Sequence, residues 1–346
     1  MSNASNVSSF TGLVDLLSEN LGGKALACTD DFFAGMENLV KPGRGVFLPD
    51  EYTEQGKWMD GWESRRRRGG PDHDWCILEL GVPGKIRAFD IDTNFFLGNH
   101  PPFAAVDAVH APGATTEALK SAKWVEVLPQ SPLKAGSQNL FAAAAPGSYT
   151  HVRLRIYPDG GVARFRVFGD VESDWKLVEE RPETLALIKP GEVDLASIRN
   201  GATALACSDM FFSPMENLIT PGPAKNMGEG WETRRKRHPG YDWILIKLAA
   251  RGRVDMAVLD THFFKGNFPD RAMLQGIDAP TTQITDLMHG DEGWSTLLPE
   301  TKMASDTRFH FRNQLSSVGP ITHIRVKTFP DGGISRMRLY GTREPA

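Results

Sequence analysis

Cysteine is scarce in this sequence: Cys28, Cys76 and Cys207 are the only three among 346 residues. A small and odd number of cysteines excludes the disulfide framework that small secreted domains rely on. No apolar run approaches the roughly 20 residues that a membrane-spanning helix needs. The first ten residues, MSNASNVSSF, lack the basic and apolar segments of a secretion signal. These absences predict a cytoplasmic globular protein without a membrane partner.

An excess of basic residues is also missing. The 39 Lys and Arg residues face 43 Asp and Glu residues, which gives a net charge of −4 at pH 7. Proteins that bind nucleic acid without sequence preference usually carry an excess of basic residues, so we expect no nucleic-acid partner. Zinc, Walker, dinucleotide and nucleophile-elbow motifs are absent, so no cofactor is certain. A divalent metal would have to rely mainly on carboxylate ligands.

The sequence contains a tandem duplication. Ala27–Leu39 (ACTDDFFAGMENL) and Ala206–Leu218 (ACSDMFFSPMENL) are identical at nine of thirteen positions. An extra stretch around Gly45–Lys57 occurs only in the first half. Four collinear matches predict two related domains. The other three matches pair Gly61–Arg68 with Gly230–Arg237, Asp92–Pro101 with Asp260–Pro269, and Thr150–Gly169 with Thr322–Gly341.

The spacing of these segments predicts the domain boundaries. Pro182, Pro190 and Gly191 favour a linker between the two repeats. We therefore expect a flexible N-terminal tail at 1–20, a first repeat at 21–180, a linker at 181–195 and a second repeat at 196–346.

Each repeat has the pattern of a β-domain. His151–Tyr157 and Val162–Phe168 alternate apolar and polar residues, and a Pro-Asp-Gly-Gly turn lies between them. Trp75–Leu80 and Ile86–Asp92 also resemble strands, with Gly81–Gly84 as a turn. Many short strands, 34 glycines and 23 prolines are typical of an all-β sandwich or jelly roll.

Arginines recur on the polar side of these strands. If the two strands form a hairpin, Arg153 lies opposite Arg166, and Arg325 lies opposite Arg338 in the second repeat. Like charges opposite each other destabilise a sheet unless they are compensated. Acidic residues on neighbouring strands would compensate them structurally. Alternatively, the guanidinium groups bind an anionic substrate, because they hold carboxylates bidentately.

A basic run follows the same Gly-Trp-Glu in both halves. Arg65 and Arg66 of the first half correspond to Arg234 and Arg235 of the second. Such a run often forms only a solvated loop. Its recurrence in an acidic protein equally supports a role in binding a substrate or forming an interface.

Several acids and one histidine recur as well. Asp30 and Glu37 flank the pair Phe32-Phe33, which could desolvate a carboxyl group, raise its pKa and suit it to acid–base catalysis. Their alternative role is in turns and caps. His151 is an alternative proton carrier, although a lone strand histidine is more often structural. The counterparts in the second repeat are Asp209, Glu216 and His323; Glu63/Glu232, Asp74/Asp242 and Asp92/Asp260 recur too.

Taken together, the duplicated motifs resemble the allantoicase family. The motifs are D-x-FF-x-x-MENL, GWE-[ST]-RR-[RK]-R, DT-x-FF-x-GN-x-P and TH-[VI]-R…PDGG, and they extend from about Gly22 to Gly341. The resemblance implies two jelly rolls of galactose-binding-like type, usually assembled into homo-oligomers. It also implies hydrolysis of allantoate to ureidoglycolate and urea in purine catabolism, the degradation of allantoin.

Allantoate suits the repeated residues, because it carries one carboxylate and two ureido groups. The predicted catalytic residues are Asp30, Glu37, His151, Asp209, Glu216 and His323. The predicted substrate-binding residues are Arg65, Arg66, Arg153, Arg166, Arg234, Arg235, Arg325 and Arg338. Two alternatives stay open: a non-catalytic jelly-roll module that binds a carbohydrate or small anion, and a second repeat that serves assembly only.

Overall fold

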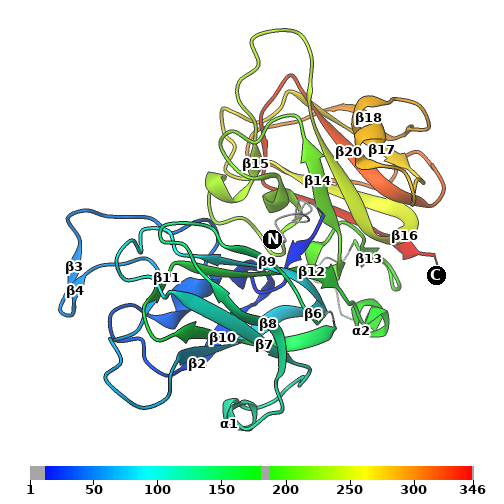
Figure 1. Ribbon diagram of the computed structural model, residues 1–346. Helices are drawn as coiled ribbons and strands as arrows, with labels where there is room; N and C mark the ends of the chain where they lie inside the picture. Colours follow the sequence, from blue (N-terminus) through cyan, green and yellow to red (C-terminus); the bar gives the residue numbers. More distant parts are fainter. Residues whose placement is uncertain (1–11, 146, 181–186, 345–346) are drawn as a thin grey trace. The chain divides into compact units, whose positions relative to one another are not determined.

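The computed structural model describes residues 12–145, 147–180 and 187–344. The chain divides into two units, Met1–Glu172 and Ser173–Ala346 (Figure 1). Each unit holds one eight-stranded sheet beside smaller two-stranded sheets, and the main path of the large sheet runs β1-β12-β6-β10-β7-β8 in the first unit and β13-β22-β16-β20-β17-β18 in the second. The strand order is the same in both units, so the prediction of an all-β tandem fold is confirmed.

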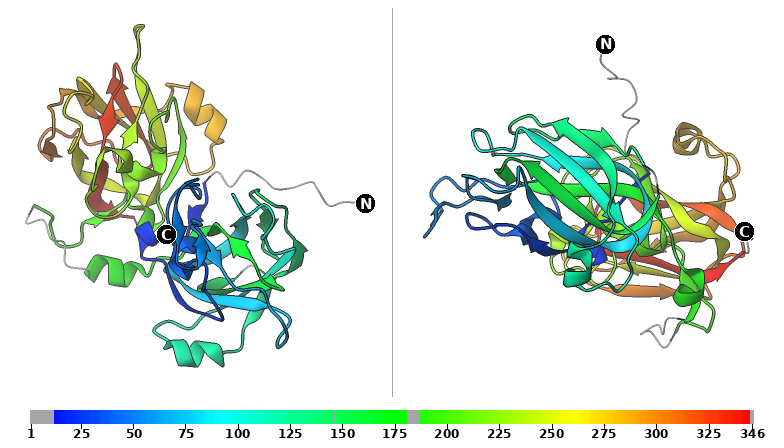
Figure 2. Two further views of the ribbon diagram at one scale, coloured as in Figure 1. Left: turned by 90° about the vertical axis from the view of Figure 1, so that its left-hand side faces the viewer. Right: turned by 60° about the horizontal axis from the view of Figure 1, so that its bottom comes forward.

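The strands of the first unit are β1 (Val14–Asp15), β2 (Lys24–Cys28), β3 (Tyr52–Thr53), β4 (Gly56–Lys57), β5 (Trp62–Glu63), β6 (Asp74–Asp92), β7 (Phe103–Val109), β8 (Val125–Pro132), β9 (Leu140–Ala142), β10 (Ser148–Tyr157), β11 (Gly161–Val162) and β12 (Arg164–Val171). Its helices are η1 (Glu19–Leu21), η2 (Met36–Val40) and α1 (Thr116–Lys120). The β3–β4 hairpin occupies the stretch that the second repeat lacks (Figure 2).

The strands of the second unit are β13 (Val193–Asp194), β14 (Thr203–Cys207), β15 (Trp231–Glu232), β16 (Asp242–Asp260), β17 (Arg271–Ile277), β18 (Ser295–Lys302), β19 (Arg308–Phe311), β20 (Ile321–Phe329), β21 (Gly333–Ile334) and β22 (Arg336–Arg343). Its helices are α2 (Trp175–Glu180), η3 (Ile198–Asn200), η4 (Met215–Ile219), η5 (Met227–Glu229) and α3 (Ile284–His289). No helix in the described ranges is both long and apolar enough to cross a membrane.

Strand β6 folds over and contributes to both layers of the first sandwich. Its first half pairs with β2 and β10, and its second half pairs with β12 and β9. The change of partners falls at the predicted turn Gly81–Gly84, although the backbone stays extended there. A side chain at Gly84 would meet the backbone oxygen of Asp170 at 2.5 Å, so this close approach requires glycine. Asp74 and Asp92 consequently lie at the same end of the sandwich.

The predicted hairpin between β10 and β12 is wrong. Both strands pair with β6, and they lie in opposite layers. The apolar residues of both strands still face the core: Leu154 and Phe165 are fully buried. In the second unit, Val326 of β20 and Leu339 of β22 belong to one hydrophobic cluster. The alternation therefore identified the core faces correctly, while the turn chemistry did not identify the pairing partner.

The first unit begins earlier than predicted. Residues 1–11 of the predicted tail lie outside the described residues. Val14, however, pairs with Gly169, and Leu16 and Leu17 are fully buried, so 12–20 belongs to the sandwich rather than to a flexible tail. In the predicted linker, 181–186 lies outside the described residues, and Val193 pairs with Gly341 in the second unit.

Candidate active site

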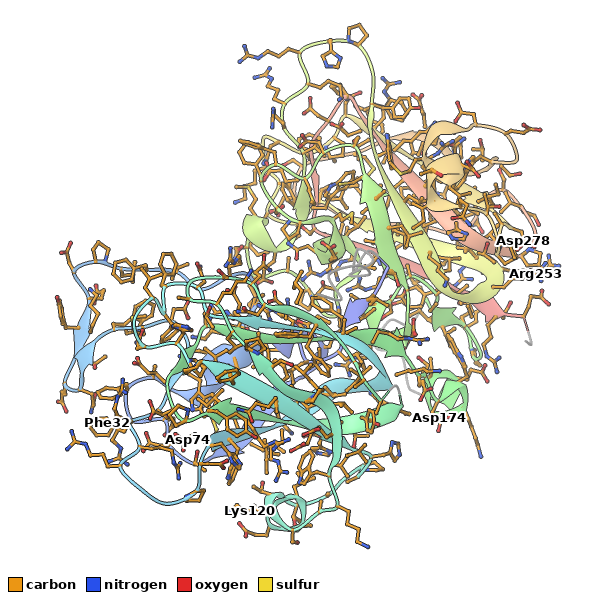
Figure 3. The ribbon with its side chains drawn as sticks, in the orientation of Figure 1. Phe32, Asp74, Lys120, Asp174, Arg253 and Asp278 are labelled. Atoms are coloured by element: carbon orange, nitrogen blue, oxygen red, sulfur yellow. The ribbon has the colours of Figure 1, made fainter. Side chains whose placement is uncertain are left out.

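The repeated segments meet at one end of each sandwich. In the first unit, the turn after β10 binds two other segments: the Gly160 oxygen accepts from the Ser64 nitrogen at 3.2 Å, and the Gly161 nitrogen donates to the Asn99 oxygen at 2.8 Å. A bridge between Ala34 and Glu63 adds the D-x-FF-x-x-MENL segment. All four repeated segments therefore build one loop cluster, and in Figure 3 Phe32 and Asp74 both lie at this end.

Buried contacts hold this loop cluster identically in both units. The indole nitrogen of fully buried Trp62 donates to the Asp30 oxygen at 2.8 Å, and that of Trp231 donates to the Asp209 oxygen at 2.9 Å. These bonds fix the backbone of the two aspartates. Asn38 and Asn217 also donate to the oxygens of Gly61 and Gly230, respectively.

Asp30 is held as a carboxylate by Arg65. Its Oδ1 accepts from the Arg65 backbone nitrogen at 2.8 Å, and its Oδ2 accepts from Arg65 Nε at 2.8 Å. Partial burial acts to raise the pKa of Asp30, but the hydrogen bonds from Arg65 and Phe32 outweigh it and lower that pKa. The expected rise in the pKa of Asp30 therefore does not occur, and the Phe pair beside it is itself substantially exposed, Phe32 at 48% and Phe33 at 36%.

The corresponding arginine of the second unit is arranged differently. The Arg234 backbone nitrogen donates to Asp209 Oδ1 at 2.7 Å, as in the first unit. Its guanidinium stacks on the Phe211 ring at 4.3 Å, and no described residue forms a hydrogen bond or ion pair with it. The charged end of Arg234 is therefore available to a ligand.

A pocket of about 590 Å³ lies beside this free guanidinium group. The guanidinium groups of Arg235 and Arg237 likewise make no hydrogen bond or ion pair within the described part of the chain. Three uncompensated positive charges at one pocket favour an anionic ligand. The lining residues are Asp209, Phe212, Arg234, Arg235, Lys236, Arg237, His238 and Asp242.

Asp242 is a pocket residue that was not singled out as a candidate from the sequence. It is 1% exposed, and its Oδ1 accepts from Ser208 Oγ at 2.8 Å and pairs with Lys236 Nζ at 2.9 Å. Its recurrence as Asp74 in the first repeat was the available sequence signal.

Glu37 and Glu216 lie on the short helices η2 and η4, next to the loop cluster. Both residues are solvent-exposed as a whole. Desolvation by the surrounding protein nevertheless raises the pKa of the Glu216 carboxyl, which suits a proton donor. Burial, followed by the charges of Glu216 and Asp209, raises the pKa of the Cys207 thiol to about 11. Burial also raises the pKa of Cys28 to about 12, so neither cysteine is a ready nucleophile at neutral pH.

The structure does not bring the two histidines to the loop cluster. His151 pairs with Glu79, whereas Ile156, five residues further along β10, pairs with Asp74. Five strand residues span about 17 Å, so His151 lies away from the acids that it was expected to assist. Burial lowers the pKa of His151, and burial together with Lys247 lowers that of His323 to about 4. Both imidazoles are neutral at pH 7.

The predicted pairing of Arg153 with Arg166 is wrong, because the two strands lie in opposite layers and both arginines face outward. Arg153 donates to Asp107 Oδ2 from Nε at 2.9 Å and from Nη2 at 2.7 Å. Arg166 donates to the backbone oxygens of Lys41 and Gly43. Both arginines are compensated structurally, which is the alternative considered for them.

Arg325 and Arg338 are separated in the same way. Arg325 is 4% exposed; its Nε donates to Gln275 Oε1 at 3.1 Å, and its Nη2 pairs with Asp291. Arg338 donates to the Thr220 oxygen at 2.6 Å and the Gly222 oxygen at 3.0 Å. Neither arginine lines the 590 Å³ pocket.

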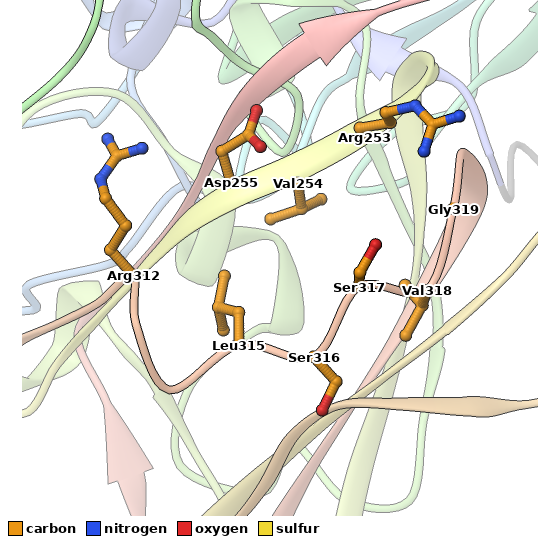
Figure 4. Close-up of a pocket in the computed structure, with 9 residues that line it drawn as sticks. All are labelled: Arg253, Val254, Asp255, Arg312, Leu315, Ser316, Ser317, Val318 and Gly319. Atoms are coloured by element: carbon orange, nitrogen blue, oxygen red, sulfur yellow. The ribbon is translucent and has the colours of Figure 1, made fainter.

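A second, smaller pocket lies elsewhere in the second unit. Its volume is about 170 Å³, and its lining includes Asp255 of β16 and Arg312 (Figure 4). Burial and the charge of Glu192 raise the pKa of Asp255. None of the predicted site residues lines this pocket.

The described residues do not form an evident metal centre. Across 12–145, 147–180 and 187–344, no group of three or more His, Cys, Asp and Glu side chains is placed to hold a metal ion.

Comparison with known proteins relates both units to one family. Residues 14–172 and 193–344 match the model of the Allantoicase repeat family. The chain is 41% identical over 330 residues to probable allantoicase 1 of Burkholderia mallei, which covers 95% of this chain and 94% of that protein. It is 43% identical over 331 residues to the allantoicase of Dictyostelium discoideum, covering 94% and 86%. The crystal structure of allantoicase from Saccharomyces cerevisiae has a TM-score of 0.79 at 31% identity, covering 97% and 95%.

Proposed function

This chain belongs to the allantoicase family, and from that premise we propose that it hydrolyses allantoate to ureidoglycolate and urea. We place the reaction in the 590 Å³ pocket of the second repeat. The observation that carries this placement is the set of free guanidinium groups on Arg234, Arg235 and Arg237, beside the carboxylates of Asp209 and Asp242.

The pocket matches the polar groups of allantoate. The substrate has a central carbon that bears one carboxylate and two ureido groups. Arg234 and Arg235 bind the carboxylate, because guanidinium groups donate two parallel hydrogen bonds to it. The ureido N–H groups need acceptors, and the pocket carboxylates provide them.

Hydrolysis requires two proton transfers. Water adds its oxygen to the central carbon, the bond from that carbon to one ureido nitrogen breaks, and the departing nitrogen takes up a proton to give urea. Glu216 is the proposed proton donor, because desolvation of its carboxyl raises its pKa. It lies on η4, outside the residues that line the pocket, and near enough to Asp209 that both charges act on the Cys207 thiol. Asp209 is the proposed acceptor of the proton from water. In elimination followed by hydration, the acceptor would first take a proton from the remaining ureido nitrogen while the donor protonates the departing urea. Water would then add to the C=N bond, losing one proton as that nitrogen regains one.

Two further expectations remain proposals. We infer that the protein works in the cytoplasm, because its three cysteines are free and form no disulfide framework. We also infer a homo-oligomer, since the family resemblance implies one. Sedimentation of the purified chain would distinguish an oligomer from a 38.1 kDa monomer.

Release of urea tests the proposed activity. Purified full-length protein is incubated with allantoate, with and without added divalent metal, and urea and ureidoglycolate are quantified. We expect the two products in equal amounts. Binding of allantoate without urea release would instead identify a non-catalytic binding module. If the protein neither binds allantoate nor releases urea from it, the assignment is refuted.

A further inference from the structure

A buried carboxylate oxygen in the second unit has no hydrogen-bond partner among the described residues. The side chain of Asp242 is almost wholly buried at the first position of β16. Ser208 and Lys236 both engage Oδ1, at 2.8 Å and 2.9 Å. The other oxygen, Oδ2, is buried and unpartnered within this described part of the chain.

The first unit repeats this arrangement with different side chains. Asp74, the first residue of β6, is 1% exposed; its Oδ1 accepts from Thr29 Oγ1 at 2.7 Å and pairs with Arg67. Its Oδ2 is again buried without a partner among the described residues. Lys and Ser have replaced Arg and Thr between the repeats, yet the same oxygen is left over. The unpaired acceptor is thus a feature of the site rather than of one side-chain conformation.

Such an oxygen needs an explanation, because the great majority of buried polar atoms in proteins are hydrogen-bonded. Leaving an acceptor of a charged group unpaired costs more stability than leaving a neutral one unpaired. Asp242 also lines the 590 Å³ pocket, together with Arg234 and Arg235. A donor supplied by the pocket's occupant would satisfy the oxygen.

We propose that Asp242 is the residue by which the pocket recognises a ureido group, with Oδ2 accepting one of its N–H groups. This inference rests on the proposed function, because it takes allantoate as the occupant. Lys236 and Ser208 are positioning residues: they occupy Oδ1 and so direct the acceptor capacity of Oδ2 to the substrate. Carboxylate binding by the arginines selects anions, and Asp242 selects among anions those with N–H donors.

Substitution of Asp242 by Asn provides a sharp test. The amide is nearly isosteric, and Lys236 and Ser208 keep its oxygen at the Oδ1 position. The amide NH2 then replaces Oδ2, so a donor faces the donor of the ureido group. The probes are allantoate and 2-ethylbutanoate, an anion with a carboxylate on a branched carbon and no N–H groups. The affinity for allantoate is taken from the KM of urea release, or from calorimetry where a variant releases no urea, and that for 2-ethylbutanoate from calorimetry and competitive inhibition.

We expect Asp242→Asn to weaken allantoate binding roughly tenfold to a hundredfold, while 2-ethylbutanoate binds as well as before or better. The matched control is Asp74→Asn, which changes the equivalent residue of the first repeat and should leave both affinities unchanged. Equal weakening of both anions, or no change for allantoate, would overturn the assignment of Asp242.

A second variant covers failure of Asp242→Asn to fold. Lys236→Met with Asp242→Leu replaces the buried ion pair by apolar groups of similar size, a change that proteins often tolerate. Loss of Lys236 weakens the binding of both anions, so the readout is the ratio of the two affinities. This ratio should shift against allantoate by a factor similar to that expected for Asp242→Asn. An unchanged ratio would refute the inference. If the unmodified protein neither binds nor hydrolyses allantoate, the proposed function fails first.

Discussion

The two repeats share a framework but balance their charges differently. In both, a buried Trp holds an aspartate backbone and an Asn holds the Gly-Trp-Glu segment. Arg65 of the first repeat is closed onto Asp30, whereas the Arg234 guanidinium has no ionic partner among the described residues. Duplication has therefore preserved the contacts that shape the loops, while the first arginine of the basic run differs. Arg66 and Arg68, like Arg235 and Arg237, make no hydrogen bond or ion pair through their guanidinium groups among the described residues.

The arginines on the outer faces differ in the same sense. Asp107, which is 4% exposed, pairs with both Arg153 and Arg155 in the first repeat. At the position of Asp107 the second repeat has the neutral Gln275, and Arg325 pairs instead with the exposed Asp291. The outward-facing arginines are thus neutralised by a buried carboxylate in the first repeat and by an exposed one in the second.

The extra stretch of the first repeat adds a further contrast. It forms the β3–β4 hairpin, and Phe47 within it stacks on Phe95 with ring centroids 5.4 Å apart. Phe95 belongs to a repeated segment next to the loop cluster. The insertion thus adds apolar surface beside the first cluster that the second cluster does not have.

The largest expected contrast is in the response to acid, and it arises from His323. Burial, together with Lys247, lowers its pKa from the ordinary 6.5 to about 4, so the folded chain binds the proton less well than the unfolded chain. The contribution of neutral His323 to the stability of the folded chain is complete above pH 6.5 and is lost as the pH falls towards 4. A shift of this size corresponds to about 3 kcal/mol. Urea denaturation should show that the free energy of unfolding of His323→Gln falls less between pH 6.5 and 4 than that of the unmodified protein. The same pH dependence in both proteins would argue against this role of His323.

Asp90 in the first repeat should respond in the opposite direction. It is 4% exposed, and burial raises its pKa from 3.8 to about 6, although Gln138 donates to it at 2.7 Å. The folded chain is stabilised while Asp90 is protonated, and this stabilisation is lost as the pH rises from about 4 through 6. At pH 8, Asp90→Asn should raise the free energy of unfolding by up to about 3 kcal/mol, with no gain below pH 4. The second repeat has Val258 here, which shows that the fold accepts a neutral residue. Equal stability of both proteins at pH 8 would contradict this expectation.

The third contrast concerns catalysis. Arg234→Met removes a ligand-facing charge but keeps most of the apolar stem, so kcat/KM for allantoate should fall roughly tenfold to a hundredfold. Arg65→Met is the matched variant of the first repeat and should change kcat/KM little, because Arg65 already pairs with Asp30. Steady-state kinetics of both variants decide between the repeats. A larger loss with Arg65→Met would move the active site to the first repeat.

Much of the fold could be predicted from the sequence, because repetition and alternation are local patterns. The core faces of β10 and β12 followed from residues such as Leu154 and Phe165. The strand partners did not, since a Pro-Asp-Gly-Gly turn closes a hairpin and a connection between layers equally well. The arginine pairs inherited that error.

The candidate site was harder to predict, because burial and charge compensation depend on distant segments. Asp30 and Arg65 recur in sequence, but only the fold shows that the first is ionised by the second. Asp242 recurs as plainly as Asp209 does, yet its unpartnered oxygen can be recognised only once Ser208 and Lys236 are in place.

Strand β16 folds over as β6 does, because its first half pairs with β20 and its second half with β22, and this has a consequence for the order of folding. Its two halves lie in different layers, and its ends, Asp242 and Asp260, meet at the pocket end as the ends of β6 do in the first unit. The pocket thus combines residues attached to both layers, including contacts separated by about a hundred residues, such as that from Lys236 to Asp331. Contacts of such separation form late, because loop closure must precede them. A nascent or partly folded chain with only one completed layer would therefore lack a complete pocket, even if its arginines were already ordered.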